Sequence, residues 1–483
     1  MAQIALAAAS TASAVFSAGG VASFTFLGLS GGQALAASFL VRAALGYALN
    51  SLTTRPEQVS RGYTVNSLGP ALPHQIIYGE TVVGGVVSYQ ALTTDSTTDD
   101  LLHRVISFAG HEIDSYQAIY VNGEEVTLDG SGNVTAPAKW VGLIRIKEHL
   151  GTDSQAADSD LVSEVTEWTS THQGKGIAYL YARFKGASNF SNGVPIVTAK
   201  IRGRKVDAGA WDNNPSLCVS DYVTADFGLN DEASSIDSTT FDAAETTCDE
   251  TVGAAKRYTI NGAFLLDAAP EDILRAMISS MGGTFWRYGD KWALNAAEYF
   301  TPTITLTEDD LRGNVRVATR HSQRDNFNAV QGVYRGSETD WQESDYTEVS
   351  AGVYLYEDNN AESKTDLPLI FTDTDAMAQR IAKTFLRRNR FQVTVQAPFG
   401  LAALDVKIGD NVMLTFAYMG WTQKVFECVD WRLNFAPDGD IIINMLLREM
   451  DEQVFTGILA NLQDESGNDL TDESAVTLEG LVA

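Results

Sequence analysis

The amino-acid sequence predicts a mainly β protein with some α structure (α+β). Two sheet-rich domains are joined by α/β segments and follow an apolar helical N-terminus. Residues 81–89 and 177–184 alternate apolar and polar side chains and are rich in β-branched and aromatic residues, which is typical of half-buried strands. Asn122-Gly123 directly follows another strand-like run and is a strong hairpin signal. A second strand-rich block spans residues 303–449.

The chain of 483 residues is long enough for about three domains and can bury a core without disulfides or metal ions. Its 45% hydrophobic and 20% charged residues are ordinary for a globular protein. We expect five successive segments: an apolar N-terminal segment (1–55), a first β domain (56–205), an acidic linker with a small α+β domain (206–300), a second β domain (301–450) and an acidic C-terminal tail (451–483).

The N-terminal segment carries no Lys, Arg, Asp or Glu before Arg42. About 20 apolar residues suffice to span a bilayer, so a membrane anchor is one interpretation. A secretory signal peptide is less favoured, because the first ten residues lack a basic region. The many Gly and Ala residues favour a helical hairpin that packs against copies of itself or a partner. Its large apolar side chains are the candidate contacts for a membrane, a partner or further copies of the chain: Phe16, Phe24, Phe26, Leu27, Leu29, Phe39 and Leu40.

Residues 28–32 match the G-x-S-x-G pattern of a nucleophile elbow around Ser30. An α/β-hydrolase needs several strands before that elbow, whereas only 29 residues precede Ser30. We therefore interpret these small residues as sites of close helix packing.

A strongly acidic stretch separates the two β domains. No basic residue occurs between Lys205 and Lys256, whereas eleven acidic residues do. We interpret it as a solvated linker rather than a metal site, because charge runs usually face water. The three cysteines are widely spaced, include no C-x-x-C motif and are expected to be reduced, with Cys428 in a strand and the others in or beside the acidic stretch: Cys218, Cys248 and Cys428.

Two helices and one hairpin are predicted in the second half. A helix over residues 270–281 opens with a proline and two acids and is followed by a glycine pair. Residues 285–293 predict a hairpin around Gly289-Asp290. Residues 375–388 predict a helix with one apolar face and arginines near its C-terminus. Residues 451–483 hold eight acids and no base, which predicts a poorly ordered or partner-docked tail.

The net charge of −28 disfavours contact with a phosphate backbone, so no sequence-specific nucleic-acid binding is expected. An acidic inner wall would still let DNA slide through a channel without sticking.

No pattern of catalytic or metal-binding residues stands out. The six histidines include no H-E-x-x-H motif, and residues 464–473 lack the spacing of an EF-hand loop. Trp286, Tyr288 and Trp292 are candidates for a sugar-binding face, although alternating aromatics in a hairpin more usually pack in a core or a subunit interface. We therefore predict no enzyme activity and no catalytic, cofactor-binding or metal-binding residues.

Two passages carry a family resemblance. The first opens with Ile77-Tyr78-Gly79-Glu80 and continues through His111 to the turn at Asn122-Gly123. The second is WDNNP at residues 211–215, followed by Leu-Cys and Asp-Tyr, with Ser216 where the family pattern W-x-x-N-P-A-L-C-x-x-D-Y has Ala. These passages resemble siphophage central tail hub proteins of the tip-attachment class. Further likenesses, to the closing β domain of that family, lie at residues 378–390, 400–404, 408–410, 425–431 and 447–449. The resemblance as a whole covers roughly residues 60 to 450.

The resemblance implies a baseplate-hub-like protein of a bacteriophage tail tip, made in the host cytoplasm and carried in the virion. Three copies would form a ring in which two β-barrel-like domains per chain, about 60–205 and 300–450, match the tail tube. The implied partners are the distal tail protein, the tape-measure protein, and other tail-tip and fibre proteins. The apolar N-terminus would plug the ring and enter the host membrane during DNA ejection. Family members commonly continue into fibronectin-like modules and a fibre, so we expect separate fibre proteins to recognise the receptor here.

Two other classes remain open. A tail-associated cell-wall or polysaccharide hydrolase, or a carbohydrate-binding module, would lyse or bind walls when purified. A membrane-anchored surface adhesin would fractionate with bacterial membranes.

Overall fold

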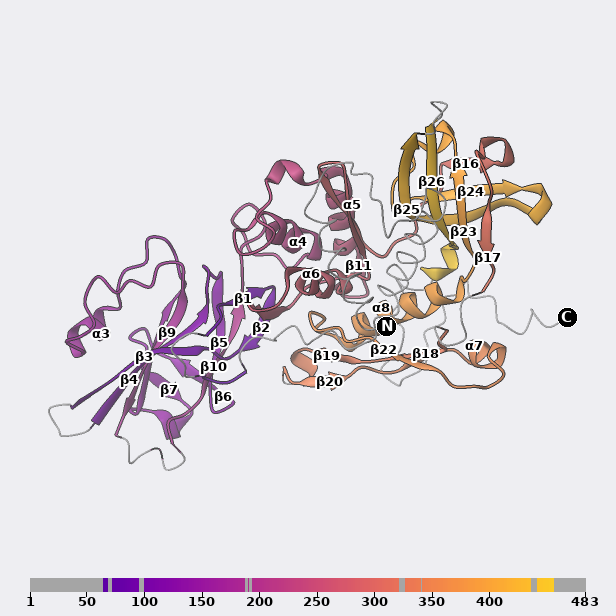
Figure 1. Ribbon diagram of the computed structural model, residues 1–483. Helices are drawn as coiled ribbons and strands as arrows, with labels where there is room; N and C mark the ends of the chain where they lie inside the picture. The colour runs from indigo at the N-terminus through magenta and orange to yellow at the C-terminus, as the bar shows by residue number, and fades with distance from the viewer. Residues whose placement is uncertain are drawn as a thin grey trace, which may run out of the picture.

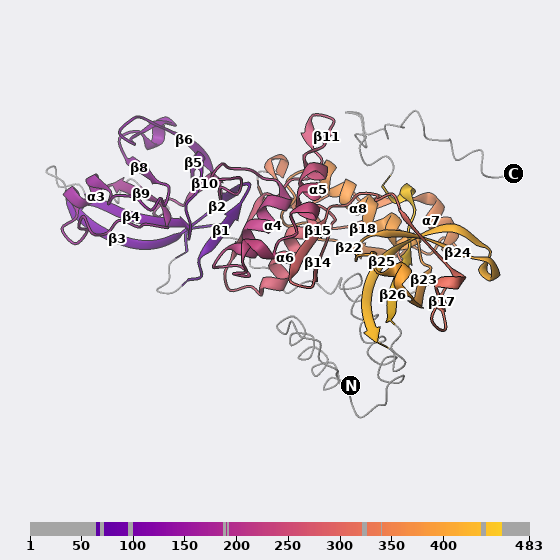
Figure 2. The same ribbon diagram turned by 90° about the horizontal axis from the view of Figure 1, so that it is seen from above.

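The computed structural model describes residues 64–67, 72–94, 100–186, 190, 193–320, 326–339, 341–435 and 441–455. They form three bodies in a row, each built around its own apolar cluster (Figures 1 and 2). Strands dominate and helices gather in the middle, which agrees with the predicted α+β class. The seven apolar candidates of the N-terminal segment, Ser30 and the tail after Phe455 lie outside the described residues.

The first β body packs two antiparallel sheets face to face. One has the strand order β3-β4-β9-β8 and the other β2-β10-β5-β6-β7. Ile106, Phe184 and Val121 are among the buried side chains between them. Its elements are β2 (Glu80–Val83), β3 (Val86–Thr94), β4 (Asp100–Ala109), β5 (Ser115–Val121), β6 (Glu124–Leu128), β7 (Val134–Ala136), β8 (Ile144–His149), α3 (Ser159–Glu164), β9 (Ala178–Lys185) and β10 (Val197–Arg202).

The hairpin at Asn122-Gly123 is confirmed, because it joins β5 to β6 with φ values of 51° and 80°. The single strand expected over residues 81–89 is wrong. Gly84 and Gly85 divide it into β2 and β3, which belong to different sheets. A Cβ atom on Gly85 would lie 2.6 Å from the Ser107 carbonyl oxygen, so this crossing between sheets requires glycine.

The middle body surrounds the largest apolar cluster. Helices α4 and α5 pack against each other and, with α6 and α8, enclose the cluster, while short strand pairs cover its remaining sides (Figure 1). Its elements are β1 (Gln75–Tyr78), α4 (Pro215–Thr224), α5 (Ser238–Asp249), β11 (Thr251–Val252), β12 (Ala255–Lys256), β13 (Gly262–Leu265), α6 (Pro270–Ser279), β14 (Thr284–Tyr288), β15 (Lys291–Asn295), β18 (Ala329–Gln331), β19 (Val333–Arg335), β20 (Glu343–Asp345), β21 (Val349–Ser350), α7 (Gly352–Glu357), β22 (Lys364–Asp366) and α8 (Asp375–Arg390).

The acidic stretch after Lys205 is not the solvated linker that its charge predicts. Helices α4 and α5 lie there and bury Cys218, Tyr222 and Phe241, because apolar residues recur on the inner face of each helix. All three cysteines are free, as expected, and all three are buried. The predicted α6, α8 and β14–β15 hairpin are also confirmed.

The second β body is one six-stranded sheet with the order β16-β24-β25-β26-β23-β17. All its pairs are antiparallel except β16 with β24. Its elements are β16 (Ile304–Thr307), β17 (Arg316–Ala318), β23 (Thr394–Phe399), β24 (Asn411–Phe416), β25 (Trp421–Phe435) and β26 (Ile441–Glu449).

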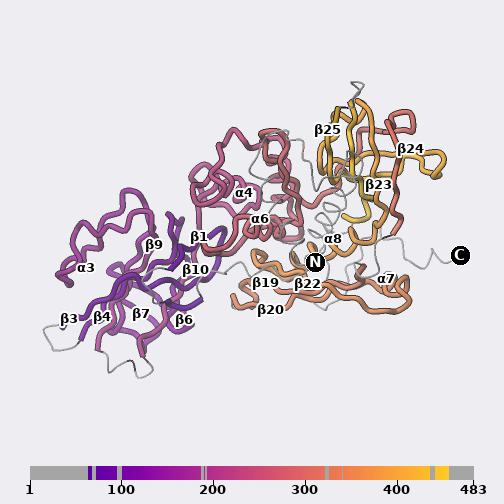
Figure 3. Tube along the Cα trace, in the orientation of Figure 1, coloured from indigo at the N-terminus to yellow at the C-terminus, as the bar shows by residue number. Residues whose placement is uncertain are grey.

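The barrel-like form expected for the two β domains is not found in the described part of the chain, where the sheets stay open. Figure 3 shows one reason: the chain leaves the second β body after β17, runs through β18 to α8 in the middle body, and returns at β23. The residues between therefore build the middle core rather than closing the sheet.

A buried carboxylate joins the middle and second β bodies. Glu427 on β25 pairs with Arg388 on α8 and, at 2.6 Å, with Arg448 on β26. Burial raises the pKa of Glu427, but the two guanidinium groups outweigh it and hold that pKa below its usual value.

Candidate functional site at the joint between the first two bodies

Strand β1, the Gly79 turn and strand β2, residues 75–83, form the joint between the first β body and the middle body. All four residues of β1 are buried. Ile76 and Tyr78 face the middle core, whereas Ile77 faces the core of the first β body. β1 pairs with β13 of the middle body, and β2 pairs with β10 of the first. The strand therefore belongs to two cores at once.

Gly79 makes the change of direction possible. Its φ is +63°, in the left-handed region that side chains rarely adopt. A Cβ atom there would lie 1.9 Å from the carbonyl oxygen of Ile260. The Gly79 carbonyl accepts hydrogen bonds from the backbone N–H of Gly203 and from Nε1 of Trp211. The backbones of both bodies thus approach too closely for any other residue.

Asp221 on α4 holds the joint from the middle body. Its Oδ2 accepts a 2.5 Å hydrogen bond from the Tyr78 hydroxyl. Arg204 makes a two-pronged contact with the same carboxylate, at 2.6 Å from Nε and 2.8 Å from Nη2. The Arg204 backbone N–H also donates to the Ile77 carbonyl. Burial, followed by the charge of Asp221, raises the pKa of Tyr78 well above its usual value, so the phenol stays a donor.

The WDNNP passage places Asp221. Asn214 caps α4 by accepting from Ser216 N–H, and Pro215 occupies the first turn, where no N–H is needed. Asp212 accepts from Asn214 N–H and fixes the turn before the cap. Trp211 lies under the Arg202 guanidinium, 4.4 Å from it to the ring centroid. Trp211, Asp212, Asn214 and Pro215 therefore each have a structural task at or beside the joint.

His111 supports the joint from the first β body. Its Nε2 accepts a 3.0 Å hydrogen bond from Ile77 N–H, and Nδ1 lies 2.7 Å from the Glu112 carbonyl, so the neutral ring with a proton on Nδ1 satisfies both contacts. Burial lowers the pKa of His111 to about 4. His111 thus lies two residues after the end of β4, with hydrogen bonds at both ring nitrogens.

Asn261 fastens the far side of the turn. Its Oδ1 accepts from Glu80 N–H at 2.8 Å, and its Nδ2 donates to Asp373 at 2.9 Å. Burial raises the pKa of Asp373. The Glu80 side chain pairs with Lys200 and Arg202, whose combined effect outweighs burial and lowers its pKa.

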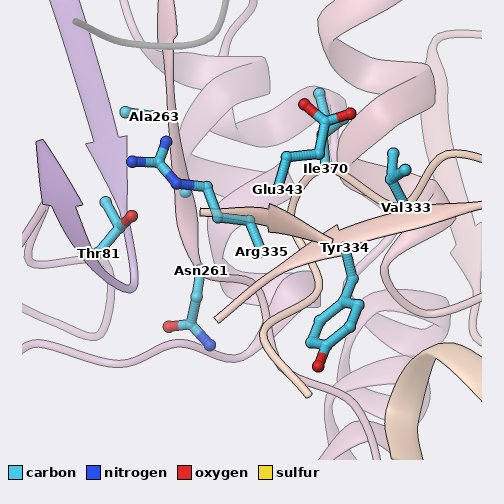
Figure 4. A pocket seen from close by; sticks show the side chains of 9 residues that line it. Thr81, Asn261, Ala263, Val333, Tyr334, Arg335, Glu343 and Ile370 are labelled. Atoms are coloured by element: carbon cyan, nitrogen blue, oxygen red, sulfur yellow. The ribbon is translucent and has the colours of Figure 1, made fainter. Parts of the chain in front are cut away.

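A small hollow beside Asn261 is lined by both bodies (Figure 4). In Figure 4 the Arg335 side chain reaches from β19 toward Thr81 of β2. Its Nη2 donates a 2.8 Å hydrogen bond to the Val82 carbonyl. This hydrogen bond is a third side-chain contact that holds residues 75–83 to the middle body, after those of Asp221 and Asn261.

The joint brings together the two passages that carry the family resemblance. The N-terminal candidates lie outside the described residues, so the structure places none of them. Trp286 and Trp292 are buried, so the core interpretation of these tryptophans is confirmed.

The sequence reasoning missed Arg204, Asn261 and Arg335. The alternating basic run that contains Lys200, Arg202 and Arg204, just before the acidic stretch, is the one signal that points to a charged contact.

The joint is suited to holding two bodies at a fixed angle, since its polar groups are engaged with one another. Among the described residues, no group of three His, Cys, Asp or Glu side chains is placed to hold a metal ion. No helix within the described ranges is long and apolar enough to cross a membrane.

Comparison with known proteins gives fold likenesses only. No protein-family model and no curated protein sequence matches. A chain in the virion of a native gene transfer agent particle superposes with a TM-score of 0.60 at 16% identity, covering 88% of this chain and 98% of that one. A tail protein from Neisseria meningitidis MC58 has a TM-score of 0.32 at 12% identity, covering 78% and 99%. The 43 kDa tail protein of prophage MuSo2 from Shewanella oneidensis has a TM-score of 0.31 at 8% identity. That match covers 80% of this chain and 100% of the other. The first likeness shows a shared fold over nearly the whole chain.

Proposed function

We propose that this chain is a structural hub of a long-tailed bacteriophage tail tip, which closes the tail tube as a homotrimer and gates DNA ejection. The observation that carries the proposal is the joint. The two passages that resemble tail hub proteins meet there through Tyr78 and Asp221, which lie 143 residues apart in the sequence. The contact fixes the first β body against the middle body, and a fixed angle between bodies is what a ring-forming protein needs.

The fold likeness adds support. The matched chain belongs to the virion of a gene transfer agent particle, and 98% of its length is covered. A chain that shares its fold with a virion component fits a structural role in a particle. The net charge of −28 fits a passage through which DNA slides without sticking.

In this proposal the ring binds the distal tail protein and the tape-measure protein, and separate fibre proteins attach to it. The apolar segment 1–55 plugs the ring on its axis, where three copies shield one another from water, and enters the host membrane on opening.

Labelling of intact particles tests the location. The turn at Gly130 is exposed, and a Cβ atom there would meet nothing within 4 Å, so a short epitope inserted after it is expected to leave the fold intact. Gold-labelled antibody should mark the distal end of the tail in electron micrographs. Label along the tail shaft, on the capsid or absent from particles would overturn the proposal. Purification of tagged chain from infected cells should bring down the distal tail and tape-measure proteins.

A further inference from the structure

The inner face of one sheet in the first β body continues past the core that covers it. Leu92 on β3 lies opposite Leu102 on β4, and Leu102 lies opposite Phe184 on β9. Directly paired residues share a face of the sheet. Along this row the exposed fraction rises from 2% at Phe184, through the half-buried Leu102, to 71% at Leu92. The second sheet therefore leaves the β3 end of an apolar face without cover.

The same corner has an unpaired strand edge. β3 is the outer strand of its sheet, and Figure 2 shows it along the margin of the first β body. Ser67 pairs with the start of β3, through Gly85 and Val87, but no described strand pairs with residues 88–94 on that side. β3 contains no charged residue, whereas the opposite edge strand β8 carries Arg145, Lys147 and Glu148. Charges are a common protection of free edges, and β3 lacks it.

Arg104 lies on that face beside Leu92. It is directly opposite Gln90 in the β3–β4 ladder and is half-buried. Its Nε is buried without a hydrogen-bond partner, and no ion pair involves Arg104 within the described part of the chain. Burial lowers the pKa of Arg104, and no acid opposes that effect. A cation without a counter-charge is notable in a chain with 62 acidic and 34 basic residues. We call the exposed Leu92, the half-buried Leu102, Arg104 and the edge 88–94 the β3 corner.

We propose that a second copy of this chain docks on the β3 corner, adding a strand to the edge at residues 88–94 and placing a carboxylate against Arg104. The proposal rests on the proposed function and deepens it by naming the surface that joins the copies. Two copies that each carry a charge of −28 repel over most of their surfaces. The β3 corner is uncharged apart from one unpaired cation, and the second copy has an excess of carboxylates to offer. When a different segment of the second copy supplies the added strand, the contact is head-to-tail, and head-to-tail contacts can close into a ring.

Association of the purified full chain tests the surface. Leu92→Lys changes an exposed side chain and should leave the fold intact, and Arg104→Glu reverses the cation. The wild-type chain should associate in mass photometry, and each variant should associate about tenfold more weakly or worse. Leu401→Lys is the matched control, because Leu401 is a 58% exposed leucine of the second β body. A wild-type chain and Leu92→Lys variant that associate equally would overturn the proposal, as would equal weakening by Leu401→Lys.

Zero-length cross-linking identifies the occupant. The Arg104→Lys variant keeps the cation and introduces an amine that a carbodiimide joins to a contacting carboxylate. In an equal mixture of ¹⁴N- and ¹⁵N-labelled chains, peptides that join Lys at position 104 to an acid of the other isotope would support the proposal. Links to acids of the same isotope alone, or links only to another tail protein in assembled particles, would overturn it.

Failure of the two proposals can be told apart. If gold label marks the distal tail but the variants still associate like wild type, the hub stands and the β3 corner is not its interface. If label is absent from the tail tip while the variants lose association, the interface stands and the hub function fails.

Discussion

The Tyr78 hydroxyl donates a 2.5 Å hydrogen bond to the carboxylate of Asp221, although 143 residues separate them in the sequence. Arg204 contacts the same carboxylate through two nitrogens. One acid on α4 therefore ties together the strand that leads into the first β body and the segment that leads out of it.

Asp221→Asn should lower the free energy of unfolding by about 2 kcal/mol or more, because Arg204 is left partly buried without a counter-charge. Urea unfolding followed by tryptophan fluorescence measures the change. Asp290→Asn, at the exposed tip of the β14–β15 hairpin, is the control and should stay within about 0.5 kcal/mol of wild type. Equal effects of the two variants would contradict the role given to Asp221.

Gly79→Ala should be more destabilising than Gly123→Ala. Both glycines have positive φ, +63° and +80°, so both variants lose about 1 kcal/mol to backbone strain. Only at Gly79 does a Cβ atom meet a carbonyl oxygen, at 1.9 Å, whereas nothing lies within 4 Å at Gly123. Thermal melts of the two variants should therefore differ, with Gly79→Ala unfolding at the lower temperature or failing to fold. Equal melting temperatures would mean that the backbones at Gly79 and Ile260 can move apart without loss of stability.

Stability should fall with acidification through His111. Its pKa is about 4 in the folded chain against 6.5 for an ordinary histidine, so the unfolded chain binds a proton that the folded chain does not. The stability that neutral, buried His111 allows is fully present above pH 6.5 and is lost as the pH falls from 6.5 toward 4. Between pH 7.5 and 5.5 it should amount to about 1 kcal/mol.

The His111→Gln variant, whose amide oxygen can still accept from Ile77 N–H, should lose about that much less stability than wild type over the same pH interval. The exposed His172→Gln variant is the control and should follow the wild-type pH profile. Parallel profiles of wild type and His111→Gln would show that His111 is not held neutral by burial.

Glu427→Gln should destabilise the contact between the middle and second β bodies by about 3 kcal/mol, because two half-buried guanidinium groups lose their shared, buried counter-charge. Glu348→Gln removes an exposed partner of Lys364 and should cost at most about 1 kcal/mol. Hydrogen exchange measured by mass spectrometry should increase along β25 and β26 in the first variant only. Unchanged exchange there would indicate that apolar contacts alone hold the two bodies.

Deletion of residues 1–50 should leave a soluble chain that assembles into tails, since these residues lie outside the described bodies. Particles carrying the deletion should release DNA early or fail to deliver it. Potassium efflux from infected cells and plaque counts measure delivery. Normal infectivity would remove the plug from the proposal while leaving the hub.

Local signals predicted local structure well. Asn122-Gly123 gave a hairpin because both residues tolerate positive φ, and Pro270 opened α6 because a first-turn residue needs no N–H donor. The acidic stretch misled because its net charge hides the apolar faces of two helices. Cys218 and Tyr222 lie on the inner face of α4, and Phe241 lies on the inner face of α5.

Local sequence patterns could not predict the contacts at the joint. The resemblance marked Tyr78 and Asp221, yet nothing in their spacing says that they touch, since the contact depends on how β1 packs against α4. Asn261 and Arg335 lie in unremarkable sequence and act through backbone carbonyl and amide groups, which carry no sequence signature.

The alternation of Ile76 and Tyr78 toward one core and Ile77 toward another has a mechanical consequence. A load that twists one body acts on strand β1, which also forms part of the core of the other body. Neither core can therefore be disturbed without the other. The two should respond to force as a single stiff lever, and an angular change at a tail tip would have to arise at the contact around Glu427 or between chains.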